Sequence, residues 1–195
     1  MLSLTEQAHQ LCGAASGDIV IDATAGNGHD TLFLAQRVGP LGQVYAFDIQ
    51  ESALKSTATR LTAAGMTNVR LIHDDHAHMR KWIEPQHRGC VSTVMFNLGY
   101  LPRGDKSIVT KSSSTLAAID DAISLLHVGG RLTILAYPGH SGGFEETAAV
   151  ERTVAAFPPS LLVKWYSGHV GERFSPKLLM VEKTRSDETP TPVAG

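Results

Sequence analysis

The chain has 195 residues, of which 43% are hydrophobic and 18% charged, and its formal net charge is -2 at pH 7. This length suits one α/β domain with a well-buried core, and the composition excludes a chain that is disordered throughout. The slightly negative charge argues against a broad basic surface for nucleic acid, although it leaves room for a local basic patch.

The N-terminal segment is predicted to form a helix. Ser3 and Glu6 have the spacing of a capping box, and Leu4, Ala8 and Leu11 then repeat at helical spacing. The segment has no long apolar core, which argues against a secretion signal. A soluble protein without a membrane partner is expected, because no apolar stretch is as long as a membrane span.

Cysteine usage indicates the compartment. The chain has two cysteines, Cys12 and Cys90, which are far apart and form no C-x-x-C pair. A reducing compartment is the simpler interpretation, so a cytoplasmic protein is expected.

Strands and helices alternate along most of the chain. Strands are predicted at 18–23, 43–48, 69–74, 92–100, 131–137, 161–166 and 177–183. Helices are predicted at 28–38, about 54–64, 79–83, 116–126 and 143–157, and Gly129-Gly130 is expected to close the fourth of these. Such alternation predicts a mainly parallel sheet with helices on both faces.

The last two strands depart from this rule. Only residues 167–176 separate them, which is short for a crossover helix, so an antiparallel pair is expected. The sequence therefore predicts an α/β fold of Rossmann-like type, with a seven-stranded, mostly parallel sheet and an antiparallel C-terminal hairpin. A single domain is expected over 1–184, followed by a disordered, polar and Pro-rich tail at 185–195.

The glycine-rich stretch "DATAGNGHDT" (22–31) follows the first strand, where ligands bind in doubly wound sheets. Nicotinamide-binding folds need G-x-G-x-x-G, but after Gly26-Asn27-Gly28 the third glycine is missing. Asp30 also places negative charge where a pyrophosphate would sit, and Asp22 adds a second acid to the turn. A dinucleotide is therefore disfavoured, and a cationic ligand without phosphate, such as S-adenosylmethionine, is favoured.

Two further strand ends carry polar residues that suit this cofactor. Asp48 follows the second strand and could accept both ribose hydroxyls, with Ile49 and Gln50 beside the adenine. Asp75 and His76 follow the third strand and could bind the adenine edge. Singly, the glycines could only make a tight turn and the acids could only cap helices. Three coordinated positions on consecutive strand ends favour the cofactor site.

The run "HDDHAH" (73–78) is rich in potential metal ligands. Adjacent residues at a strand end point in different directions, and no cysteine or H-E-x-x-H pattern accompanies them, so no metal is expected. Whether Asp74 or Asp75 contacts the adenine stays open.

The segment "FNLGYLPRGDKSIVT" (96–110) leaves the fourth strand at the edge of the same expected cleft. Amine-methylating enzymes of this fold place an Asn or Asp, two prolines and an aromatic residue here. Asn97 and Tyr100 match the first and last of these positions, whereas Leu98 and Gly99 replace the prolines. His140, after the fifth strand, is a candidate for removing the amine proton, or it could only satisfy backbone groups of its loop.

Basic residues flank the same segment. Arg103, Lys106 and Lys111 could contact RNA phosphates, or they could be ordinary solvated charges.

Taken together, these motifs resemble a known family. The blocks "DATAGNGHDTLFLA", "VYAFDIQ", "LIHDDH", "FNLGYLPRGDKSIVT" and "AYPGH" are similar to those of small bacterial methyltransferases first described as rRNA methylases and now associated with wobble uridine modification in tRNA. The resemblance extends from about residue 3 to 183, and the block after Phe96 is its most specific part.

The resemblance implies a class I methyltransferase fold that uses S-adenosylmethionine. It also implies conversion of 5-aminomethyl-2-thiouridine at tRNA position 34 to the methylaminomethyl form, with the anticodon stem-loop as partner. The cofactor contacts that it implies are Asn27, Asp30, Asp48, Gln50, Asp75 and His76.

Other functions are weighed against this one. A methyltransferase acting on a small molecule such as an amine is the first alternative, because the chain is slightly acidic and has no large added domain for gripping RNA. Ribosomal RNA is kept as an alternative acceptor. A nicotinamide oxidoreductase and a non-catalytic binding module rank lower. Pairing of two copies into a homodimer would extend the surface offered to RNA, and the sequence leaves it open.

Overall fold

The computed structural model describes residues 2–99, 101, 109–167 and 175–185. Within these ranges the strands form a seven-stranded sheet in the order β3-β2-β1-β4-β5-β7-β6. Their bounds are β1 (Ile19–Asp22), β2 (Gln43–Asp48), β3 (Val69–His73), β4 (Val91–Leu98), β5 (Leu126–Ala136), β6 (Leu161–Ser167) and β7 (Lys177–Lys183). Strands β1 to β5 pair in parallel, and β7 is antiparallel to both β5 and β6. The predicted sheet and its antiparallel final pair are confirmed.

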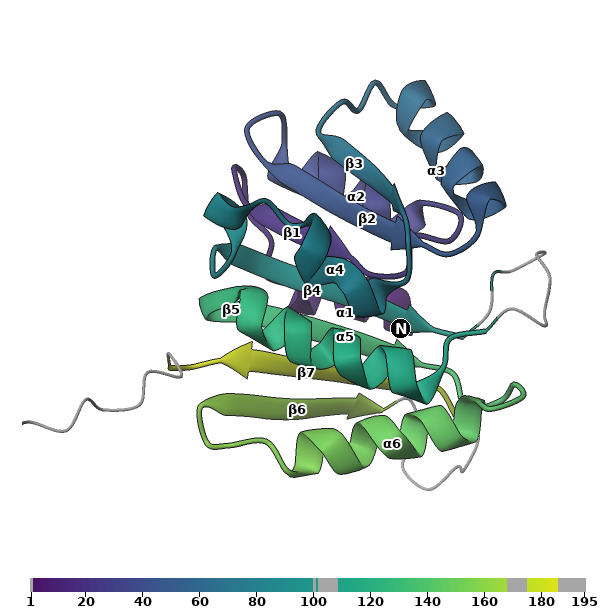
Figure 1. Cartoon of the computed structure of the whole chain (residues 1–195), viewed down its shortest axis with the longest axis vertical. Coiled ribbons are helices and arrows are strands. Elements are labelled where there is room, and N and C mark those ends of the chain that lie inside the picture. The colour runs from purple at the N-terminus through teal and green to yellow at the C-terminus, as the bar shows by residue number, and fades with distance from the viewer. Residues whose placement is uncertain (1, 100, 102–108, 168–174, 186–195) are drawn as a thin grey trace, which may run out of the picture.

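Helices cover both faces of the sheet, as expected (Figure 1). Their bounds are α1 (Leu4–Leu11), α2 (His29–Val38), α3 (Glu51–Ala63), α4 (Met79–Trp82), α5 (Ser112–Leu125) and α6 (Gly143–Ala155), with 3-10 turns η1 (His76–His78) and η2 (Pro85–His87). Helices α1, α2 and α3 pack on one face, and α4, α5 and α6 pack on the other. The molecule is therefore a three-layer α/β/α sandwich.

Alternating side chains of the central strands supply the two halves of the core. Val20 of β1 and Val44 of β2 belong to the cluster beneath α1 to α3. Their neighbours Ile21 and Tyr45 belong to the cluster beneath α4 to α6. This is the period of two that a strand imposes, and burial on both faces explains why these strands read as continuous apolar runs.

Helix α1 begins with the predicted capping box. The backbone N–H of Glu6 donates to Ser3 Oγ at 3.2 Å, and the backbone N–H of Ser3 donates to Glu6 Oε2 at 2.7 Å. The cap fixes the start of a helix whose later residue, His9, reaches the candidate site.

One predicted boundary is wrong. Helix α5 ends at Leu125 and β5 begins directly at Leu126, so Gly129 and Gly130 lie inside a strand rather than after a helix. The register of β5 against β4 shifts in this stretch, and Gly129 has φ of +88°. A Cβ on Gly130 would lie 3.0 Å from the carbonyl oxygen of Val91. The glycines therefore permit an irregular strand start to pack closely on β4.

The order of the strands places the candidate site. The chain runs outward from β1 through β2 to β3 on one side, and from β4 to β5 on the other. The C-terminal ends of these parallel strands share one edge of the sheet, and the reversal between β1 and β4 is where ligands bind in such folds.

Two further expectations concern the ends of the chain and its environment. Apart from Arg185, the tail that is expected to be disordered lies outside the described residues. Among the described helices, none combines the length and the apolar composition that a membrane span requires.

Candidate active site

A cavity of about 1010 Å³ opens where the loops after β1 to β5 meet. Ligand sites span roughly 300–1,000 Å³, so this one has room for a nucleoside-sized cofactor and part of an acceptor. The structure gathers most of the predicted site residues in its walls. They are Gly26, Asn27, Asp30, Asp48, Ile49, Gln50, Asp75, His76, Asn97, Lys111 and His140.

Asp22 lies beneath the glycine loop and is not among the residues that line the cavity. Its side chain is 1% exposed and accepts hydrogen bonds from the Thr24 backbone N–H at 3.1 Å and the Thr31 hydroxyl at 2.6 Å. Burial, together with the nearby charge of Asp30, raises the pKa of Asp22 to about 7. Asp22 therefore links the Thr24 backbone to the Thr31 side chain beneath the glycine loop.

Gly28 is also not among the residues that line the cavity. It caps α2 with φ of +77°, in the left-handed region that favours glycine. A Cβ at this position would lie 2.8 Å from Thr57 Oγ1 and 2.9 Å from Thr57 Cα. Gly28 is needed for α2 and α3 to pack closely, which matches the simpler interpretation of a glycine in a tight turn.

Asp48 joins the ends of β1 and β2. Its Oδ2 accepts the Gly26 backbone N–H at 2.9 Å, and its Oδ1 accepts the Gln50 backbone N–H at 2.8 Å. Each carboxylate oxygen retains a further lone pair, and the residue lines the cavity. The side chain can therefore hold the glycine loop in place and still accept hydroxyl groups of a ligand.

The two acids after β3 have different surroundings. Asp74 accepts hydrogen bonds from His78 Nδ1 at 2.8 Å, Trp82 Nε1 at 2.7 Å and the Asp75 backbone N–H at 2.8 Å. The His78 and Trp82 bonds are the main reason that the pKa of Asp74 falls to about 2. Asp75 accepts the Ala77 backbone N–H at 2.9 Å and its side chain is 38% exposed. Asp75 is thus the better placed of the two to bind a ligand.

His76 offers a buried hydrogen-bond acceptor. Its Nδ1 lies 3.1 Å from the carbonyl oxygen of Ala23, so Nδ1 carries the proton and Nε2 has a lone pair. Burial lowers the pKa of His76, which keeps the ring neutral. The side chain is 8% exposed, and Nε2 has no hydrogen-bond partner among the described residues. A ligand amine reaching this wall would satisfy it.

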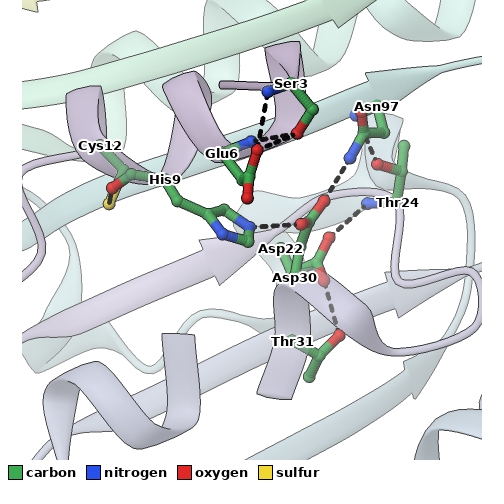
Figure 2. A network of polar contacts seen from close by, with 9 residues as sticks. All are labelled: Ser3, Glu6, His9, Cys12, Asp22, Thr24, Asp30, Thr31 and Asn97. Carbon is green, nitrogen blue, oxygen red and sulfur yellow. Dashed lines mark hydrogen bonds and ion pairs between the residues drawn. The ribbon is translucent and has the colours of Figure 1, made fainter. Parts of the chain in front are cut away.

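Asn97, at the end of β4, is held by two other elements (Figure 2). Its backbone N–H donates to Thr24 Oγ1 at 2.7 Å, and its side-chain amide donates to Asp30 Oδ2. The other oxygen of Asp30 lies 2.6 Å from Nε2 of His9, whose ring stacks on Phe33 with 3.8 Å between centroids. Residues of α1, α2 and β4 thus form one connected group beside the cavity.

The end of β5 supplies two rings. His140 Nδ1 lies 3.0 Å from the carbonyl oxygen of Ser141, as expected if His140 supports its own loop, and the residue also lines the cavity. Tyr137 lines the cavity too and is 39% exposed, and its partial burial raises the pKa of its hydroxyl. The ring of Tyr137 is available to pack on a flat acceptor.

Thr110 lies beside the end of β4. The Thr110 backbone N–H donates to the Gly99 carbonyl at 3.0 Å, and the Thr110 hydroxyl donates to Glu146 of α6 at 2.6 Å. Lys111 follows and is exposed at the cavity. Tyr100, Arg103 and Lys106, which were also predicted to contribute, lie outside the described residues.

The electrostatic character of the cavity suits cationic ligands. Asp30, Asp48 and Asp75 all line it. No group of three or more His, Cys, Asp or Glu side chains in the described part of the chain could hold a metal ion.

Sequence reasoning missed His9, Thr24 and Tyr137. A single histidine on an amphipathic helix is usually a surface or core residue, so nothing local marked His9. Thr24 stood inside a recognised motif, but its bond to the Asn97 backbone depends on β1 and β4 being neighbours. Tyr137 ended a predicted strand, and an aromatic residue there is ordinary for a sheet.

Comparison with known proteins agrees with this geometry. A family model described as "Putative rRNA methylase" matches residues 44–183. A chloroplastic tRNA (mnm(5)s(2)U34)-methyltransferase of Arabidopsis thaliana is 42% identical over 153 residues, covering 74% of this chain and 55% of that protein. A Pseudomonas putida ubiquinone/menaquinone biosynthesis C-methyltransferase is 32% identical over 66% of this chain and 45% of its own length. The chain thus spans about half the length of these curated relatives.

Two solved structures are similar over nearly their whole length. A crystal structure described as that of a "putative rRNA-methylase" from Clostridium thermocellum has a TM-score of 0.88 and 38% identity, covering 94% of this chain and 98% of that one. A Streptococcus mutans protein described as "a putative methyltransferase", solved in complex with SAH, has a TM-score of 0.82 and 35% identity, covering 94% of this chain and 99% of that one.

The cavity fits the cofactor of these proteins. The carboxylate of Asp48 can accept hydroxyls, the neutral Nε2 of His76 can accept an amine, and the surrounding acids suit a sulfonium. S-Adenosylmethionine is the methyl donor. The chain belongs to the rRNA methylase family of that model and is a class I, S-adenosylmethionine-dependent methyltransferase.

Proposed function

We propose that this enzyme methylates the exocyclic amine of 5-aminomethyl-2-thiouridine at position 34 of tRNA, giving the 5-methylaminomethyl form. The observation that carries the proposal is the placement of Asn97 at the cavity, with its amide nitrogen bonded to Asp30. This arrangement leaves a carbonyl oxygen as the group that an acceptor amine would meet.

An amine attacks through its free lone pair, and such an acceptor orients that lone pair. S-Adenosylmethionine supplies an electrophilic methyl group when it is bound. The Asn97 carbonyl oxygen would accept an N–H of the amine and so direct its lone pair along the line of displacement. His140, whose ring lines the same cavity, is our candidate for helping the ammonium form lose its proton.

The cofactor side of the cavity is assigned by its chemistry. We propose that Asp48 accepts ribose hydroxyls and that Asp75 and His76 meet the adenine edge. Ile49, which is 48% exposed, and Gln50 would border the same base. Gly26 and Asn27 form the backbone turn beside the amino acid portion.

Support for tRNA comes from one relative and one local feature. The 42% identical plant protein is named for this tRNA reaction. Lys111 is exposed and lines the cavity. In the sequence, Arg103 and Lys106 also lie between Asn97 and Lys111. Such residues would grip the phosphates of an anticodon stem-loop.

Ribosomal RNA and a small-molecule amine are the competing acceptors. The family description favours the first, and the formal net charge of -2 favours the second, because it provides little general attraction for RNA.

The proposal is tested with labelled S-adenosylmethionine and tRNA from cells that lack the modification. Nucleoside mass spectrometry should show one added methyl on 5-aminomethyl-2-thiouridine. Transfer should be abolished by Asp48→Ala and slowed by Asn97→Ala. Cofactor binding without methylation of any tRNA nucleoside would overturn the tRNA assignment and put the small-molecule amine first.

A further inference from the structure

The amide of Asn97 has two possible orientations, and only one suits an amine acceptor. With its oxygen toward the cavity, Asn97 accepts an N–H and leaves the amine lone pair available. With its NH₂ group there instead, the amide would donate to that lone pair and block the attack. Something in the protein must therefore set the orientation.

Asp30 has the chemistry to do so. An ionised carboxylate accepts hydrogen bonds but donates none, so the group of Asn97 that faces Asp30 Oδ2 must be the NH₂. The side chain of Asp30 is 8% exposed, which limits competition from water. Asp22, the neighbouring acid, is buried, and burial together with the charge of Asp30 raises the pKa of Asp22 to about 7.

His9 in turn fixes Asp30. Its Nε2 lies 2.6 Å from Asp30 Oδ1, and because the carboxylate only accepts, Nε2 is the donor. Parallel stacking on Phe33, with 1° between the ring planes, holds the imidazole in place. Figure 2 shows the resulting line from His9 of α1 through Asp30 of α2 to Asn97 of β4.

We propose that His9 and Asp30 are positioning residues that hold the Asn97 amide with its carbonyl oxygen toward the acceptor amine. Asp30 then acts mainly through Asn97 rather than as the cofactor contact that the sequence suggested. The inference rests on the proposed amine acceptor.

A reciprocal exchange tests this assignment. Asp30→Asn and Asn97→Asp, made singly, should each lower kcat by about tenfold to a hundredfold, because each removes a charge-assisted hydrogen bond or sets two carboxylates together. The double variant restores one amide beside one carboxylate with an acceptor toward the cavity, so it should recover most of the lost kcat. The KM for tRNA and the Kd for the cofactor should change little.

Two results of this exchange experiment would overturn the proposal. One is a double variant no faster than the slower single variant, since a merely structural role predicts no recovery of kcat in folded enzyme. The other is a cofactor Kd that rises in Asp30→Asn by the same factor as kcat falls, which would make Asp30 a cofactor contact. The thermal unfolding midpoint of each variant shows whether it is folded at the temperature at which kcat and Kd are measured.

The part played by His9 is tested with His9→Phe, which keeps an aromatic ring on Phe33 but removes the N–H donor. It should slow transfer by about tenfold, whereas the matched control His127→Phe, at the opposite end of β5, should leave the rate unchanged. An unchanged rate in His9→Phe would remove His9 from the proposal.

Nuclear magnetic resonance separates failure of this proposal from failure of the proposed function. The side-chain amide protons of Asn97 should exchange slowly in the wild-type protein with cofactor and without RNA, and quickly in Asp30→Asn. If tRNA is not a substrate but this difference is present, the orientation stands and the acceptor is wrong. If the exchange rates are equal, the orientation itself is wrong.

Discussion

At the end of β2, the carboxylate of Asp48 supports the glycine loop and faces the cavity. Asp48→Asn keeps the size of the side chain but weakens hydrogen bonding to ligand hydroxyls and turns one acceptor into a donor. We expect the Kd for S-adenosylmethionine, measured by calorimetry, to rise by roughly tenfold to a hundredfold. We also expect a smaller decrease in the free energy of unfolding, because Asp48 accepts the backbone N–H groups of Gly26 and Gln50.

The matched control is Asp120→Asn, on an exposed position of α5. The substitution changes the formal charge by the same amount as Asp48→Asn. It should leave the Kd within a factor of about two, because Asp120 does not line the cavity. An equal effect of the two variants would show that net charge, and not the Asp48 site, governs cofactor affinity.

Asp22 should impose a pH dependence on stability. Its pKa is raised from 3.8 to about 7 on folding, so the folded state binds the proton more tightly than the unfolded state. The contribution to the free energy of unfolding is fully present below about pH 4 and is lost as pH rises through about 7, by an amount on the order of a few kcal/mol. Asp22→Asn, which does not titrate, should remove this decline.

The measurement is urea unfolding of both proteins at pH 5 and pH 8. The free energy of unfolding of Asp22→Asn, taken relative to that of the wild type, should be higher at pH 8 than at pH 5. A stability difference that is the same at both pH values would mean that Asp22 titrates normally in the folded protein.

The contact between α2 and α3 depends on Gly28. Gly28→Ala should cost a few kcal/mol of unfolding free energy, because its Cβ would meet Thr57 at 2.8 Å in addition to forcing an L residue to φ of +77°. The free energy is measured by denaturant unfolding.

Gly17→Ala is the control for backbone strain. Gly17 has φ of +86°, but a Cβ there meets nothing within 4 Å. Its loss should be about 1–2 kcal/mol, and the excess loss in Gly28→Ala then measures the contact between the helices. Equal losses would show that α3 moves aside without cost.

The sheet could be predicted from sequence because its strands are continuous apolar runs separated by helical periodicity. The antiparallel end of the sheet followed from the short connection at 167–176. The start of β5 could not be predicted, since Gly129 and Gly130 are ordinary signs of a helix end. Pairing with β4, a contact distant in sequence, overrides that local signal.

The strand ends were equally informative about the cavity, because parallel strands bring their carboxyl ends to one edge. Asp48, Asp75 and Asn97 lie there as expected from their positions. The hydrogen-bond partners of Asn97 could not be predicted from strand ends. The link from His9 to Asp30 joins residues 21 positions apart through the packing of two helices, and the link to Asn97 spans 67 positions.

For the whole molecule, a formal net charge of -2 means that RNA must be attracted locally. Lys111→Ala should weaken tRNA binding and reduce the slope of log K against log salt by roughly one phosphate contact, with the cofactor Kd unchanged. Lys164→Ala, on an exposed position of the edge strand β6, is the control and should leave the slope unaltered. If both variants behave alike, Lys111 makes no phosphate contact.

The most direct test of the proposed function compares three acceptors under one set of conditions. The rate of methyl transfer from labelled S-adenosylmethionine is measured with tRNA lacking the modification, with ribosomal RNA and with the free 5-aminomethyl-2-thiouridine nucleoside. We predict that tRNA has a much larger kcat/KM than either of the others, with the methyl on the amine of position 34. Faster transfer to ribosomal RNA or to the free nucleoside, or a methyl at any other position, would contradict the proposed function.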